Sequence, residues 1–267
     1  KFFGTLYNTY SFFSLYANID GFEYAESDIP KEKRPEIDRW ILSELNTLIR
    51  KVESYYEDYE PTKAARAIQE FVGENLSNWY VRLCRRRFWK GEYQEDKISA
   101  YQTLYTCLLN VSKLAAPIAP FFMDNLYRDL TKNVSSNEES SVHLAEISEA
   151  DDSWIDADLE RKMQKAQNIS SMVLSLSKKE MIKVRQPLQK IMIPVMDEQD
   201  RNDIEAVSNL ITSEVNVKEV ELLDDTAGIL VKKIKPNFKV LGPKYGANMR
   251  YVNQAIQGLG DEEINLM

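Results

Sequence analysis

The sequence predicts a mainly α-helical protein, in which an antiparallel helical bundle is followed by a small α+β domain. Three observations support this fold class. Apolar residues recur at steps of three and four through the first half of the chain, as on one face of a helix. Short joints separate these periodic segments, which favours helices packed side by side in opposite directions. Beyond an acidic stretch, shorter segments alternate in the manner of strands.

The first half of the chain predicts two helices separated by a loop. Residues 3–17 follow a helical period and carry aromatic side chains all round, so this helix must be packed against others. Residues 18–37 lose the period and contain two prolines, as expected for a loop. Asp38 is a suitable N-cap for the next helix. The apolar stripe of that helix is formed by Ile41, Leu45, Leu48, Val52, Tyr55 and Tyr59.

Three more helices complete the predicted bundle, which we assign to residues 1–135. Pro61 suits a first turn, and Gly91 supplies a stop for the helix between them. Its apolar stripe consists of Ala65, Ile68, Val72, Leu76, Trp79 and Leu83. A fourth helix is predicted over residues 97–115, and a fifth passes through Phe122, Leu126 and Leu130.

An acidic linker is predicted over residues 136–157. Every charged residue from Glu138 to Glu160 is an Asp or a Glu, and the segment has no apolar period. Because such a stretch has little to bury, we expect it to be the connection most sensitive to proteases. The negative charge of the chain is therefore concentrated away from the bundle.

Residues 158–267 predict the small α+β domain. The expected elements are a long helix over 158–184, a strand over 190–195, a helix over 203–211, strands over 214–223 and 229–235, and a helix over 249–259. The alternation slips between Val217 and Val220, which predicts a β-bulge.

Composition excludes several classes of protein. The chain has 267 residues, 43% of them hydrophobic, and a net charge of -8. Two cysteines and one histidine cannot form a disulfide framework or a four-ligand zinc site, and a reducing cytoplasmic environment fits them best. We expect no Ser/His/Asp or Cys/His catalytic set, because the one histidine, His143, lies alone in the acidic stretch, where a solvated side chain is expected. No apolar run is long enough to span a bilayer. Since the first residues are neither a signal peptide nor a start methionine, we expect an internal fragment of a longer protein.

The strongest local signal is a reversal of charge near residues 76–90. A basic cluster, defined as Arg82, Arg85, Arg86, Arg87 and Lys90, contains no acidic residue. One interpretation is a solvated face paired with nearby glutamates, of which the candidates are Glu70, Glu74, Glu92 and Glu95. The other is contact with nucleic acid, in which guanidinium groups bind phosphates and aromatic rings stack on unpaired bases.

The aromatic neighbours of the basic cluster favour the second interpretation. Trp79 and Tyr80 precede it and Trp89 lies within it, although Trp79 also suits a core position. The candidate site is therefore Trp79 and Tyr80 together with the basic cluster. Cys84 lies among these cations and is expected to be a small buried side chain rather than a reactive thiol.

Several motifs carry a family resemblance. They are Lys1-Phe-Phe-Gly-Thr-Leu-Tyr, Asp38-Arg-Trp-Ile-Leu, Leu76-Ser-Asn-Trp-Tyr, Arg85-Arg-Arg-Phe-Trp, Ala116-Pro-Ile-Ala-Pro-Phe, Ser141-Val-His-Leu, Val184-Arg-Gln-Pro-Leu and Lys235-Pro-Asn-Phe-Lys-Val-Leu-Gly-Pro-Lys-Tyr-Gly. Together they resemble the part of class I isoleucyl-tRNA synthetases that follows the catalytic domain. The second and third motifs are shared with valyl-tRNA synthetases, whereas the last two point to isoleucine.

The resemblance implies an anticodon-binding bundle whose partner is the anticodon stem-loop of isoleucine tRNA. It also implies a parent enzyme that attaches isoleucine to this tRNA with ATP and magnesium, as a monomer without a membrane span. Neither the His-Ile-Gly-His nor the Lys-Met-Ser-Lys-Ser type of ATP signature occurs here, and there is no editing domain or zinc module. We therefore expect no cofactor and no catalysis in this chain. The valyl enzyme and a helical interaction scaffold without nucleic acid remain alternatives.

Overall fold

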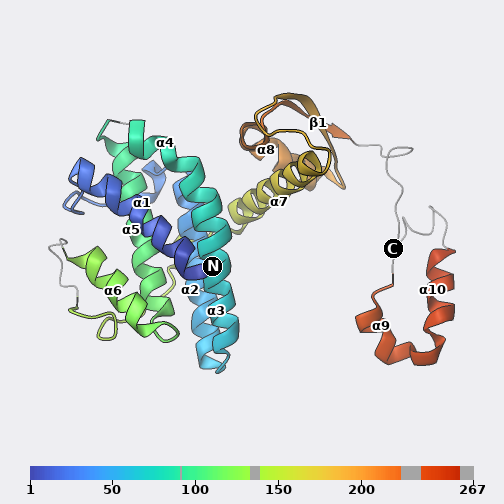
Figure 1. The fold of residues 1–267 in the computed structure, drawn as a ribbon, viewed down its shortest axis with the longest axis horizontal. Coiled ribbons are helices and arrows are strands. Elements are labelled where there is room, and N and C mark those ends of the chain that lie inside the picture. Colours follow the sequence, from blue (N-terminus) through green and yellow to red (C-terminus); the bar gives the residue numbers. More distant parts are fainter. Residues whose placement is uncertain (91, 133–138, 224–235, 259–267) are drawn as a thin grey trace. The chain divides into compact units, whose positions relative to one another are not determined.

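A computed structural model describes residues 1–90, 92–132, 139–223 and 236–258, and it is mainly helical as predicted (Figure 1). The chain divides into two compact units. The first comprises residues 1–184 together with 203–215, and the second comprises residues 185–202 together with 216–267. The first unit therefore extends well past the boundary that the sequence predicted at residues 136–157.

The bundle is built from helices that follow one another closely. They are α1 (Phe2–Asp20), α2 (Glu36–Glu57), α3 (Pro61–Glu70), the π-helix η2 (Phe71–Val81), α4 (Arg82–Lys90), α5 (Glu95–Ala115) and α6 (Pro120–Thr131). A short 3₁₀ turn, η1 (Lys31–Lys33), precedes α2. The two prolines at the starts of α3 and α6 occupy first-turn positions, where the missing N–H costs nothing.

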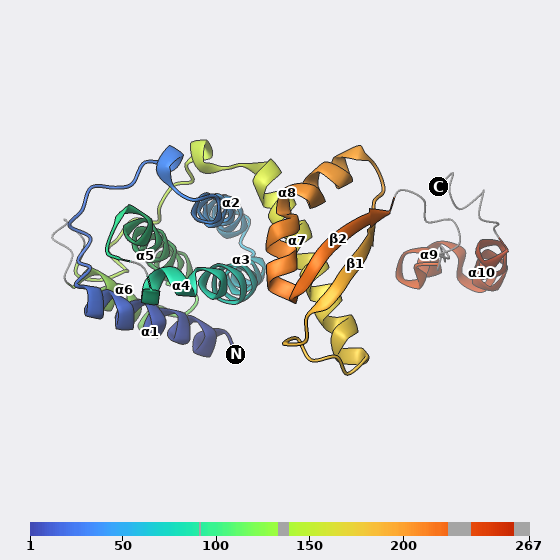
Figure 2. The same ribbon diagram turned by 90° about the horizontal axis from the view of Figure 1, so that it is seen from above.

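Helix α1 crosses α3 and α5 rather than running along them (Figures 1 and 2). Aromatic rings of α1 meet three helices: Phe12 contacts Phe88 of α4 at 5.1 Å, Phe13 contacts Tyr101 of α5 at 6.2 Å, and Phe3 contacts Phe122 of α6 at 5.0 Å between centroids. The expectation that this aromatic helix is packed by others is confirmed.

Helix α2 begins two residues before the predicted cap. Pro35 is the residue before its first turn, so Asp38 lies inside the helix and is fully buried. Its carboxylate binds side chains from α4, η2 and α5 instead of capping the helix. The prediction of Asp38 as an N-cap is therefore wrong.

A π-helical stretch changes which side chains of the third predicted helix are buried. Helices α3, η2 and α4 run on from Pro61 to Lys90 without a break, as the sequence predicted. Because the turns of η2 are wider than those of an α-helix, the apolar stripe shifts by about one residue. After Leu76 the buried positions include Tyr80, Cys84 and Phe88, while Leu83 is only partly buried.

The acidic segment is fastened to α2 along its second half. The backbone N–H of Asp151 donates to Asn46 Oδ1 at 2.9 Å, and that of Asp156 donates to Ser43 Oγ at 2.8 Å. Asp152, in the 3₁₀ turn η3 (Asp152–Trp154), pairs with Arg50. Helix α7 (Ala157–Lys179) then packs on α2, which explains why the first unit does not end at the acidic segment.

The second unit contains a two-stranded parallel sheet. Strand β1 (Leu188–Pro194) pairs with β2 (Val217–Leu223), and helix α8 (Glu198–Val215) connects them. The register is unbroken from Leu188 opposite Val217 to Pro194 opposite Leu223, so the predicted bulge is wrong. Helices α9 (Phe238–Tyr245) and α10 (Met249–Gln257) follow, joined by the short turn η4 (Gly246–Asn248). The strand predicted over 229–235 lies outside the described residues.

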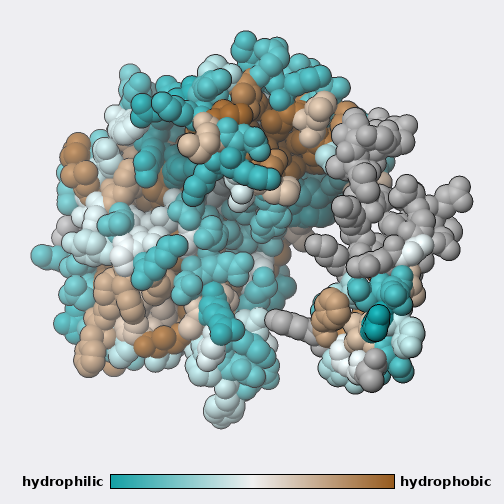
Figure 3. Space-filling view, turned by 45° about the vertical axis from the view of Figure 1, so that its right-hand side comes forward, coloured by the Kyte–Doolittle hydropathy of each residue, from teal (hydrophilic) through white to brown (hydrophobic). Residues whose placement is uncertain are grey.

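The surface is largely hydrophilic on the face drawn in Figure 3, with apolar side chains gathered in separate areas. The most exposed large apolar residues include Tyr59, Phe121 and Met181. None of the helices in the described part of the chain combines the length and the hydropathy that a membrane span requires.

Candidate nucleic-acid interface

The basic cluster occupies α4, and its members lie in two different environments. Burial of Cys84 and Phe88 fixes one side of the helix in the bundle core. Side chains beside that line are drawn into the protein, whereas those opposite it face water. The five cations consequently differ in what they can contact.

Arg87 lies on the inner side and forms a buried ion pair. Its guanidinium donates to both carboxylate oxygens of Asp38, at 2.6 and 2.9 Å, and its Nε donates to Asp96 at 3.1 Å. The side chain is 16% exposed and that of Asp38 is 0% exposed. Burial is the largest single effect and lowers the pKa of Arg87, but the hydrogen bonds and the charge of Asp38, together with the other groups around the guanidinium, raise the pKa above its ordinary value. Arg87 therefore stays charged and holds α4 against α2.

Tyr80 belongs to the same buried network. Its hydroxyl donates to Asp38 Oδ1 at 2.8 Å, and Ser99 Oγ donates to Oδ2 at 2.6 Å. The ring has no exposed surface. Burial and the charge of Asp38 raise the pKa of Tyr80 well above its ordinary value, so the hydroxyl remains a donor. In this structure Tyr80 has no surface with which to contact a ligand.

Cys84 lies between these groups, and burial raises the pKa of its thiol to about 12. The thiol is therefore neutral at physiological pH. This agrees with its interpretation as a small buried side chain.

Arg82 and Trp79 form a second pair at the junction of η2 and α4. The Arg82 guanidinium lies 5.8 Å from the centre of the Trp79 ring and pairs with Glu214 of α8. Trp79 is only 5% exposed, so most of its indole is core. Burial raises the pKa of Glu214 even though Arg82 acts in the opposite direction. Arg82 is thus partly occupied by a protein carboxylate.

Arg85, Arg86 and Lys90 form the outer side of α4. All three are exposed, and within the described ranges no hydrogen bond or ion pair joins them to another side chain. Trp89 stands beside them with 55% of its surface exposed. None of the four glutamates considered from the sequence pairs with these cations. We refer to Arg85, Arg86, Trp89 and Lys90 as the outer face of α4.

The chemistry of the outer face suits a polyanion with unpaired bases. Exposed guanidinium groups can bind phosphate oxygens through two parallel hydrogen bonds, and an exposed indole offers a flat stacking surface. Sequence reasoning named Trp89 only as a neighbour of the cluster. Trp89 is exposed because it follows Phe88, which belongs to the buried stripe of this helix. The sequence could have predicted that exposure only if the stripe had been placed at Phe88 rather than Leu83.

Comparison with known proteins identifies a family. Residues 38–192, more than half of the chain, match the model described as the anticodon-binding domain of tRNA ligase. Three similar relatives, each named isoleucine--tRNA ligase, come from Porphyromonas gingivalis, Bacteroides thetaiotaomicron and Thermus thermophilus. The first two are 62% and 60% identical to this chain over 264 residues, and the third is 40% identical over 256 residues.

These alignments cover almost all of this chain but a small part of each relative. The chain is covered to 99% in the first two and to 96% in the third. It spans only 23% of the length of the first two relatives and 24% of the third. The outer face of α4 lies within the matched region.

Proposed function

Because the chain belongs to the anticodon-binding domain family of tRNA ligases, we propose that it binds the anticodon stem-loop of isoleucine tRNA through the outer face of α4. The observation that carries this proposal is the set of three exposed, unpaired cations beside an exposed indole, in a chain of net charge -8. Phosphates require such local positive potential. The names of the relatives support isoleucine over valine tRNA.

The candidate residues predicted from the sequence divide into those that contact the tRNA and those that hold α4 in place. Arg85, Arg86 and Lys90 contact phosphates, and Trp89 stacks on an unpaired base. Arg87 and Tyr80 fix the helix through Asp38, while Arg82 and Trp79 join it to α7 and α8.

The activity belongs to a longer protein. We propose that the parent enzyme attaches isoleucine to its tRNA with ATP and magnesium, as a cytoplasmic monomer. The present chain carries neither ATP signature, so it binds tRNA without a cofactor and is not catalytic by itself.

Filter binding of isoleucine and valine tRNAs to this chain tests the proposal. We expect tighter binding of isoleucine tRNA, and Arg86→Ala to weaken the binding of both tRNAs by several-fold, since a phosphate contact is independent of sequence. Arg66→Ala is the matched control, because Arg66 is an exposed arginine of α3 outside the cluster. Equal losses in the two variants, or no measurable binding of either tRNA, would contradict the proposal.

A further inference from the structure

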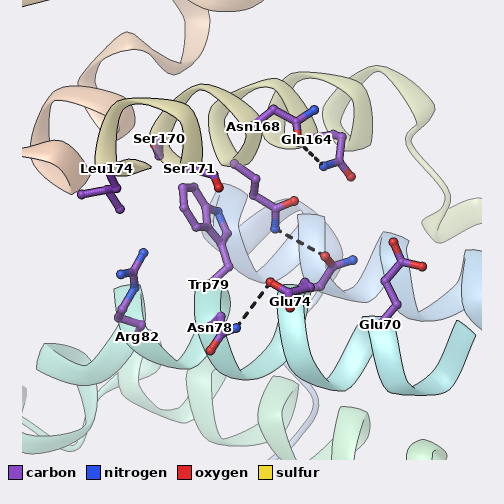
Figure 4. A pocket seen from close by; sticks show the side chains of 12 residues that line it. Glu70, Glu74, Asn78, Trp79, Arg82, Gln164, Asn168, Ser170, Ser171 and Leu174 are labelled. Carbon is purple, nitrogen blue, oxygen red and sulfur yellow. Dashed lines mark hydrogen bonds between the residues drawn. The ribbon is translucent and has the colours of Figure 1, made fainter. Parts of the chain in front are cut away.

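A cavity of about 500 Å³ lies between η2 and α7, within the first compact unit (Figure 4). The wide turns of the π-helix bring residues four apart nearly into line, so Glu70, Glu74, Asn78 and Arg82 all line the cavity. Trp79 rises from η2 towards α7. A volume of this size holds a nucleoside-sized ligand, because small-molecule sites typically measure about 300–1,000 Å³.

The amide side chains of the cavity are loosely paired with one another. Gln167 donates to Asn75 at 3.4 Å, Asn78 donates to Glu74 at 3.4 Å, and Gln164 donates to Asn168 at 3.1 Å. The two distances of 3.4 Å lie beyond the usual range of a hydrogen bond and indicate weak interactions, whereas that of 3.1 Å is ordinary. These groups can therefore exchange their present partners for those of a ligand at little cost.

Two buried polar groups on the wall have no partner in the described structure. They are the indole N–H of Trp79, in a side chain 5% exposed, and the hydroxyl of Ser170, in a residue 1% exposed. Leaving a buried polar group unpaired is costly. Both groups can donate a hydrogen bond, so acceptor atoms of a ligand in the cavity would satisfy them after the side chains that cover them rearrange.

The charges of the cavity select against a phosphate. Glu70 and Glu74 contribute two carboxylates, whereas the one guanidinium, that of Arg82, already pairs with Glu214. Carboxylates repel anions, so they favour an uncharged ligand. Because carboxylates accept hydrogen bonds, that ligand must carry donors. The cavity thus combines an aromatic ring, acceptors for an amino group and unpaired donors for ring nitrogen or carbonyl atoms.

We propose that this cavity receives one unpaired nucleobase that carries an exocyclic amino group. Such a base is planar and neutral, and it presents donors and acceptors on one edge. A glutamate is the side chain that accepts from the amino group of cytosine. The inference rests on the proposed function, because Arg82 lines the cavity and begins α4, one turn from Arg85 and Arg86.

Binding of single-stranded hexacytidylate and hexauridylate tests this proposal directly. Cytosine carries an exocyclic amino group at the position where uracil carries a carbonyl oxygen. The chain should bind hexacytidylate about tenfold more tightly than hexauridylate. Glu74→Gln should abolish that preference without changing the affinity for hexauridylate or the salt dependence. Ser170→Ala should reduce the preference in the same direction. Glu57→Gln, an exposed glutamate of α2 outside the cavity, is the control and should behave like the parent chain.

The outcomes separate the two proposals. If hexacytidylate and hexauridylate bind equally, or if Glu74→Gln keeps the preference, the base pocket is refuted. In that case, if Arg86→Ala still weakens the binding of tRNA, the proposed role of the outer face of α4 is retained. If the chain binds neither oligonucleotide nor tRNA, both proposals fail together.

Discussion

Arg87 and Asp38 form the contact that fixes the basic helix in the bundle. Replacing Arg87 with Ala leaves a buried carboxylate with only hydroxyl partners, which we expect to lower the free energy of unfolding by about 3–5 kcal/mol. Urea denaturation followed by circular dichroism measures the change. Arg87→Lys keeps the charge but loses the paired hydrogen bonds, so its free energy of unfolding should fall between those of the parent chain and Arg87→Ala.

Arg85→Ala is the matched control for this change, because Arg85 is an exposed arginine of the same helix, about half a turn from Arg87. We expect its free energy of unfolding to stay within about 0.5 kcal/mol of the parent chain. If Arg87→Ala were equally mild, Arg87 would not be the anchor described here.

Glu44 gives the bundle a pH-dependent stability. Burial first, and then the charge of Glu160, raises its pKa to about 7. The carboxyl group also accepts hydrogen bonds from Trp40 Nε1 at 3.2 Å and Asn75 Nδ2 at 3.1 Å. Because the folded pKa lies above the unfolded value of about 4.3, the stabilisation by protonation is complete below that value and is lost as the pH rises to about 7.

The free energy of unfolding should therefore fall between pH 5 and pH 8 by on the order of 1–2 kcal/mol more in the parent chain than in Glu44→Gln. Urea denaturation of both proteins at the two pH values measures the difference. Parallel pH profiles would show that Glu44 titrates alike in the folded and unfolded states.

At the scale of elements, α2 organises the first unit by holding the start of α7. Ser43 Oγ accepts from the Asp156 N–H and donates to Glu160, whose carboxylate also accepts from Thr47 at 2.8 Å. We expect Ser43→Ala to cost about 1–2 kcal/mol and to accelerate proteolysis between residues 151 and 156. Ser54→Ala, an exposed serine of the same helix, is the control. Unchanged cleavage in Ser43→Ala would mean that this anchor does not hold the segment.

At the scale of the whole molecule, the periodicity of apolar residues predicted the helices of the bundle and the helix, strand, helix and strand order that follows. It missed the π-helix, because a π-helix differs from an α-helix only in the spacing of its turns. That error moved the predicted stripe from Tyr80, Cys84 and Phe88 to Leu83, so Arg87 and Tyr80 were assigned to the surface. The acidic segment was predicted to be a free linker because the hydrogen bonds of Asn46 and Ser43 to its backbone leave no mark on the sequence.

The most direct test of the central claim is the salt dependence of binding to the anticodon stem-loop of isoleucine tRNA. Three phosphate contacts, from Arg85, Arg86 and Lys90, predict a slope of log affinity against log salt of about -2, at about -0.7 per contact with single strands. The double variant Arg85→Ala, Arg86→Ala should reduce the slope to about -0.7. A double variant with the slope of the parent chain and an intact helical fold would show that the tRNA is held elsewhere.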